Sequence, residues 1–113
     1  MRIIDFGPDP GHAITSFDSR ATLTALMRPT DAARTVVMHL PPDGIVGTHE
    51  AAAHQLFCVV TGEGWVAGDD DVRVPISPFR AAEWQPGERH TSGTDSGMVA
   101  VVIEGTFEVG LPG

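Results

Sequence analysis

The chain of 113 residues contains no lysine and no tyrosine, and its single cysteine is Cys58. Without lysine it can form neither a Schiff base with a carbonyl substrate nor a P-loop for nucleotide phosphates. Without tyrosine it lacks one of the common general acids. A single cysteine excludes an internal disulfide and a zinc site built from cysteines. The chemistry therefore depends on five histidines, fifteen carboxylates, seven arginines and two tryptophans.

Long apolar runs and excess positive charge are also missing. A transmembrane helix needs roughly 20 consecutive apolar residues, and no segment approaches that length. The N-terminal residues, 1–5, lack the apolar stretch and cleavage site of a signal peptide. A formal net charge of −8 repels nucleic-acid phosphates and anionic lipids, so neither partner is expected. We therefore expect a cytoplasmic protein whose partner is a small molecule.

Glycine and proline, thirteen and nine residues respectively, divide the sequence into short segments rich in β-branched and apolar residues. Many short strands separated by turn signals predict an all-β sandwich or barrel, here as one domain over residues 1–113. The expected strands lie near 2–6, 13–17, 21–28, 34–40, 45–49, 54–61, 64–68, 72–76, 80–84, 89–92, 97–104 and 106–109.

Two of these strands, 54–61 and 98–104, are apolar on both faces. A strand in the wall of a small antiparallel barrel normally exposes one face to water. Covering both faces requires a second layer, formed by the N-terminal strands or by another subunit. We expect a homodimer, because a domain this small buries little surface alone. The alternative is burial within one chain.

Histidines are the first candidates for a metal site. His49 ends one expected strand, Gln55 lies near the start of the next, and His90 follows a Pro-Gly turn. Neutral imidazole is the commonest metal ligand, and an amide oxygen is a further donor. On adjoining strands, these three residues would form a facial set of ligands that leaves coordination positions open. Isolated histidines are nevertheless more often surface or hydrogen-bonded residues, so spacing alone does not decide.

Two segments resemble the conserved motifs of the cupin superfamily. The first covers Pro42–His49 and Gln55–Gly64, where the family has a glycine, a His-x-His pair, an acidic residue and a second glycine. The second covers Pro86–His90, with a Pro-Gly turn and a histidine three residues after the glycine. The resemblance implies a cupin-type jelly-roll β-barrel, also called a double-stranded β-helix. It also implies a metal site at His49, Gln55 and His90.

The chain departs from the family pattern at the ligands themselves. Ala51 occupies the position of the second histidine, and Gln55 occupies that of the acidic ligand. In the second motif, Phe79 stands in place of the opening glycine and Thr94 in place of the terminal asparagine. The remaining set of two imidazoles and one amide carries no negative charge. Its affinity for a divalent ion should be lower than that of a cupin with three histidines and one glutamate.

Three further residues are candidates for the pocket. His54 lies close to the missing ligand, but it is adjacent to Gln55 and would face the other side of a regular strand unless a bulge turned it inward. His39 would add a polar group from the strand at 34–40. Trp84 precedes the second motif and would line the pocket mouth, although ordinary barrel packing explains an aromatic there equally well.

Two functions follow from the resemblance and stay open. In the first, Fe, Mn, Ni or Zn held by His49, Gln55 and His90 serves a small metal-dependent oxygenase or isomerase. In the second, the metal site is degenerate and the barrel binds a small molecule without chemistry, using the same side chains as hydrogen-bond partners. Metal content distinguishes the two.

Overall fold

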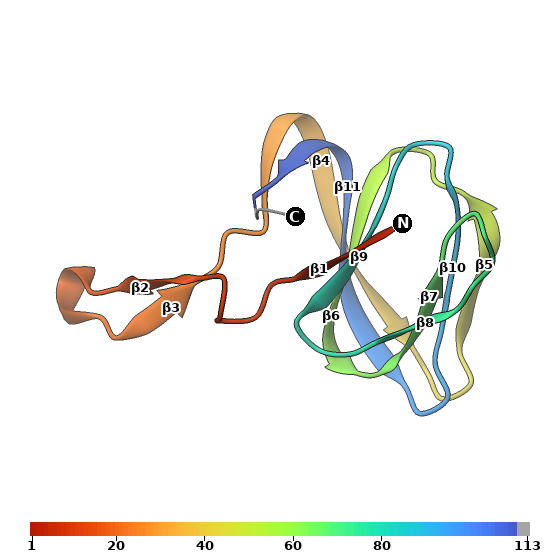
Figure 1. Ribbon diagram of the computed structural model, residues 1–113, viewed down its shortest axis with the longest axis horizontal. Coiled ribbons are helices and arrows are strands. Elements are labelled where there is room, and N and C mark those ends of the chain that lie inside the picture. Colours follow the sequence, from red (N-terminus) through yellow and green to blue (C-terminus); the bar gives the residue numbers. More distant parts are fainter. Residues whose placement is uncertain (111–113) are drawn as a thin grey trace.

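The computed structural model describes residues 1–110, which form eleven strands and one 3₁₀ turn (Figure 1). Within these residues, no helix is long and apolar enough to cross a membrane. The elements are β1 (Arg2–Asp5), β2 (His12–Ile14), η1 (Ser16–Asp18), β3 (Ala21–Leu23), β4 (Met27–Leu40), β5 (Ile45–Glu50), β6 (His54–Gly62), β7 (Gly64–Ala67), β8 (Val74–Ile76), β9 (Arg80–Trp84), β10 (Arg89–Gly93) and β11 (Met98–Val109).

Two antiparallel sheets form the barrel. One has the strand order β1-β9-β6-β11-β4, and the other has the order β5-β10-β7-β8. The interior core joins them, because Phe57 and Val102 of the first sheet belong to the same buried cluster as Val66 of the second. Strands β2 and β3 form a separate hairpin that projects away from the barrel (Figure 1). The all-β, jelly-roll prediction is confirmed.

The outer face of the five-stranded sheet carries a second apolar cluster. Leu56 and Cys58 of β6 point to this side, and both are almost completely buried. They pack with Ile4 of the N-terminal strand and with Phe107 near the end of β11. The two apolar faces of β6 are thus covered within one chain at this point, as the alternative to dimer burial required.

Strands β4 and β11 are longer than the sequence pattern predicts. The structure continues β4 through Pro29, where the sequence suggests a break between two strands. Because β4 is the outermost strand of its sheet, a proline there is tolerated. The expected strands at 97–104 and 106–109 likewise form one strand, β11, whose register shifts between Gly105 and Phe107. In this bulge the β4 residues 30–32 lie opposite the single β11 residue Thr106, so the extra residues are on β4. The alternation along β11 is unchanged, and Phe107 lies on the same side as Ile103 in the outer cluster.

Candidate functional site

A cavity of about 70 Å³ lies inside the barrel between the two sheets. The three predicted metal ligands, His49, Gln55 and His90, all line it. The remaining lining residues are Met38, Val46, Phe57, Ser92, Val102 and Glu104. The structure therefore brings together the residues that the two sequence motifs identified.

Strand pairing places the two histidines side by side. His49 on β5 is directly opposite His90 on β10, and their ring centroids are 4.2 Å apart. His49 is exposed at the surface end of the site, whereas His90 is only 5% exposed. Gln55 faces them from β6 in the opposite sheet.

The hydrogen bonds leave one nitrogen of each imidazole free for a ligand. His49 Nδ1 lies 2.7 Å from the carbonyl oxygen of Gly47. Because a carbonyl only accepts, Nδ1 donates its proton and Nε2 keeps a lone pair. His90 Nε2 is buried and has no hydrogen-bond partner among residues 1–110. A buried polar atom without a partner is unusual in a folded protein and points to an interaction with something else.

Trp84 supports His90 from the barrel core. Its ring is fully buried and lies 4.6 Å from the His90 ring. The indole Nε1 donates a hydrogen bond of 3.2 Å to the carbonyl oxygen of Ala67. Trp84 therefore packs against a site residue, with its own polar group already used, and is not among the residues that line the cavity.

Burial keeps His90 neutral. The pKa of His90 is lowered from its ordinary value of 6.5, first by loss of hydration and then by the positive charge of a protonated His49. The carboxylates of Glu88 and Glu104 act in the opposite direction. Neutral imidazole is the form that binds a metal ion, so the environment of His90 favours that role near neutral pH.

Glu104 is a cavity residue that the motif comparison does not identify. It lies on β11 directly opposite Gln55 on β6, and Gln55 Nε2 donates a 3.0 Å hydrogen bond to its Oε1. Arg34 Nη2 lies 3.1 Å from Glu104 Oε2. A signal for Glu104 was present in the sequence, because it shares the inward parity of Met98, Ala100 and Val102. A carboxylate among these inward-pointing apolar residues is unusual and marks a candidate functional residue.

The other two pocket candidates lie outside the cavity. His54 faces the outer side of β6, where its Nε2 is 2.9 Å from Glu83 Oε2 and its ring stacks on Phe107. His39 is exposed on β4, and its inward neighbour Met38 lines the cavity instead. Both positions follow from the alternation of side chains along a regular strand.

Cys58 is not a reactive thiol. It is 1% exposed in the outer apolar cluster, and burial raises its pKa to about 12. The thiolate is the reactive form, so Cys58 is chemically inert at neutral pH.

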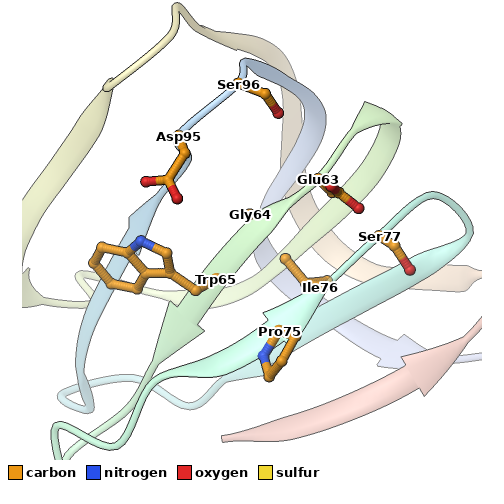
Figure 2. Close-up of a pocket in the computed structure, with 8 residues that line it drawn as sticks. All are labelled: Glu63, Gly64, Trp65, Pro75, Ile76, Ser77, Asp95 and Ser96. Carbon is orange, nitrogen blue, oxygen red and sulfur yellow. The ribbon is translucent and has the colours of Figure 1, made fainter.

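A larger hollow of about 460 Å³ lies along β7 and β8. Figure 2 shows Trp65 and Asp95 on one side of it and Pro75 and Ser77 on the other. The guanidinium of Arg73 already covers the Trp65 ring at 3.8 Å. Carboxylates and an indole line this hollow, but no imidazole does, so the candidate chemistry stays with the smaller cavity.

The donor set in the cavity limits what it can bind. Among residues 1–110, no three His, Cys, Asp or Glu side chains lie close enough together to hold a metal ion. A metal ion bound by His49 and His90 would therefore need the amide oxygen of Gln55 as a third donor. Hydrogen bonding of Gln55 Nε2 to Glu104 leaves that oxygen free.

No protein-family model matches the sequence, and no curated protein matches it either. Several solved structures do match the structure of this chain. A cupin superfamily protein from Desulfitobacterium hafniense DCB-2 aligns with a TM-score of 0.60 at 14% identity, over 92% of this chain and 97% of that one. A predicted oxalate decarboxylase from Thermotoga maritima aligns with a TM-score of 0.58 at 22% identity, over 68% and 67% of the two chains.

DMSP lyase DddQ from Ruegeria pomeroyi aligns with a TM-score of 0.61 at 19% identity, over 67% of this chain and 40% of that chain. At these identities the similarity defines the fold and leaves the activity open. The agreement covers the same double-stranded β-helix that the motifs around His49 and His90 predict. The chain therefore has the fold of the cupin superfamily.

Proposed function

We propose that this small cupin-fold protein binds a divalent metal ion in the barrel through His49, His90 and Gln55. The observation that carries the proposal is the buried Nε2 of His90, which has no partner and lies beside a second imidazole. Leaving such an atom without a partner costs about 1–3 kcal/mol. A metal ion would fill that position, and the lowered pKa of His90 favours the neutral imidazole that a metal ion requires.

The size of the cavity also supports an ion. Pockets for drug-sized ligands usually have volumes of roughly 300 Å³ or more. This cavity has about 70 Å³, enough for an ion with small ligands beside it. Its apolar lining, which includes Val46, Phe57 and Val102, would limit access of bulk water.

Bound at this site, Fe, Mn, Ni or Zn would supply Lewis-acid chemistry, or redox chemistry in the case of iron. The chain itself would hold the two imidazoles in fixed orientations, His49 through Gly47 and His90 through Trp84. We propose a small molecule as the substrate of an oxygenase or isomerase reaction. Two similar structures, the predicted oxalate decarboxylase and the DMSP lyase, are enzymes by their names, which supports an enzymatic role.

The second candidate is a cavity that binds a small molecule without a metal. The absence of a three-member group of charged or imidazole ligands within residues 1–110 favours it. A groove of about 340 Å³, lined by Ala32, Ala33 and Ala53, adjoins the cavity and shares Glu104 with it.

Elemental analysis of untagged protein purified without chelator separates the two candidates. We expect close to one Fe, Mn, Ni or Zn per chain, with at least a tenfold loss in His49→Ala and in His90→Ala. His39→Ala removes an exposed histidine outside the cavity and should retain the metal. Circular dichroism checks folding, and His49→Ala keeps the test valid if the buried His90 variant unfolds. Wild-type protein that holds no metal after incubation with each ion would favour the second candidate.

A further inference from the structure

We propose that Glu104 provides the negative charge of the metal site and orients Gln55 toward the ion. This inference rests on the proposed function. Gln55 on β6 stands where the cupin motif has an acidic ligand, and the carboxylate comes from Glu104 on the neighbouring strand β11 instead. Glu104 would then be a positioning residue whose role no sequence motif records.

The strand register places the two side chains together. Gln55 occupies the position where the first cupin motif has its acidic ligand, and Glu104 is its direct partner across the β6–β11 ladder. Both side chains line the cavity, and they are joined by the 3.0 Å hydrogen bond from Gln55 Nε2 to Glu104 Oε1. The pair therefore places an amide and a carboxylate where the motif has a carboxylate alone.

This hydrogen bond decides which end of the amide is free. A carboxylate only accepts, so it selects the nitrogen of Gln55 and leaves Oε1 without that partner. An amide oxygen is a metal ligand, whereas the amide nitrogen is not, because its lone pair is delocalised into the carbonyl. Glu104 thereby holds Gln55 in the orientation that the proposed site needs.

The charge of Glu104 is the second contribution. His49, His90 and Gln55 are neutral when they bind a cation, and Glu104 is the only carboxylate among the described residues that line the cavity. Arg34 also contacts Glu104, but its side chain is 72% exposed, so water screens its positive charge. The charge of Glu104 acts on His90, because this carboxylate opposes the lowering of the His90 pKa.

Glu104 acts on the ion indirectly in this arrangement. His49, His90 and Glu104 do not form a three-ligand group within residues 1–110, so a direct bond from Glu104 is not assigned. Residues that orient and polarise metal ligands in this way commonly change metal affinity by 10- to 100-fold when they are mutated.

The test is calorimetric titration of Co²⁺ into chelator-treated protein at pH 7.5. We expect Glu104→Gln to weaken Co²⁺ binding at least tenfold. The double variant Gln55→Glu/Glu104→Gln exchanges the two side chains, keeps one carboxylate and one amide in contact, and should bind within threefold of wild type or more tightly. Glu108→Gln is the matched control, because Glu108 lies on the same strand, pairs with exposed Arg28 and is outside the cavity.

The outcomes separate this inference from the proposed function. If wild type binds no Co²⁺, the proposed metal site is wrong and the inference falls with it. If wild type binds but Glu104→Gln binds equally well, Glu104 has no such role while the metal site stands. If the folded double variant fails to recover affinity, the exchange of roles between the two strands is wrong. The double variant also decides the matter if Glu104→Gln alone does not fold.

Discussion

At the scale of single residues, the site depends on keeping one imidazole buried and neutral. His90 is enclosed by Trp84 and His49, and its Nε2 has no partner among the described residues. The pKa of His90 is below 6.5 in the folded protein, whereas in the unfolded chain it returns to that value. Below pH 6.5 the unfolded state therefore takes up a proton that the folded state resists.

This difference predicts a pH-dependent stability for the metal-free protein. Stability from His90 is complete above pH 6.5 and is lost as pH falls through the lowered pKa, because the unfolded state then binds more protons. Other titratable groups near it, His49, Glu88 and Glu104, remain in the variant His90→Gln. Urea denaturation at pH 7.5, 6 and 5 should show a larger decrease for wild type than for His90→Gln. Parallel decreases in the two proteins would contradict the prediction.

The sequence identified His49, Gln55 and His90 because their chemistry and order match two motifs. The structure places all three around one cavity. The sequence did not identify Glu104, because the motifs describe β5, β6 and β10, and the register of β11 is a long-range property. His54 and His39 were candidates for the pocket, and the alternation of side chains along β6 and β4 explains why both point outward instead.

At the scale of elements, the bulge between β4 and β11 lies directly beside Glu104. Gly105 has φ of +142°, and a Cβ there would lie 2.4 Å from the Ala32 carbonyl oxygen and 2.6 Å from Ala33 Cα. A side chain at this position would push β4 away from β11 and strain the backbone next to Glu104. The bulge therefore requires glycine.

We expect Gly105→Ala to lower the free energy of unfolding by about 1–3 kcal/mol. Gly47→Ala is the matched control, because a Cβ at Gly47 meets nothing within 4 Å and the backbone there is not left-handed. Its effect should stay within about 0.5 kcal/mol. Urea denaturation of both variants measures the difference. Equal stabilities would show that the β4–β11 contact at the bulge can relax without cost.

Element existence was largely predictable, since short apolar runs bounded by glycine and proline predict strands. Continuity was not. A proline in the sequence suggests a break, but Pro29 lies on an edge strand, and edge position is known only once the sheet is assembled. The same holds for β11, where pairing with β4 on both sides of Gly105 joins two predicted strands into one.

At the scale of the whole molecule, apolar surface remains exposed although the outer cluster is buried. On the outer face of the five-stranded sheet, Val37 is 54% exposed and Val60 is 36% exposed. The β2–β3 hairpin projects away from the barrel (Figure 1). Phe17, between β2 and β3, is 99% exposed. An isolated two-stranded hairpin is marginally stable in water, and a long edge strand such as β4 offers unpaired backbone groups. A second copy of the chain would cover these surfaces.

We therefore expect a homodimer in which the partner covers the outer face around Val37. Size-exclusion chromatography with light scattering should give twice the chain mass of 11.9 kDa for wild type. Val37→Asp places a charge on this face and should give the monomer mass, because burying an unpaired carboxylate is unfavourable. Val72→Asp is the control, since Val72 is similarly exposed, at 57%, but lies between β7 and β8 in the other half of the barrel. A wild type that stays monomeric at high protein concentration would mean that one chain tolerates this surface in water. Loss of the dimer in both variants would place the interface away from Val37.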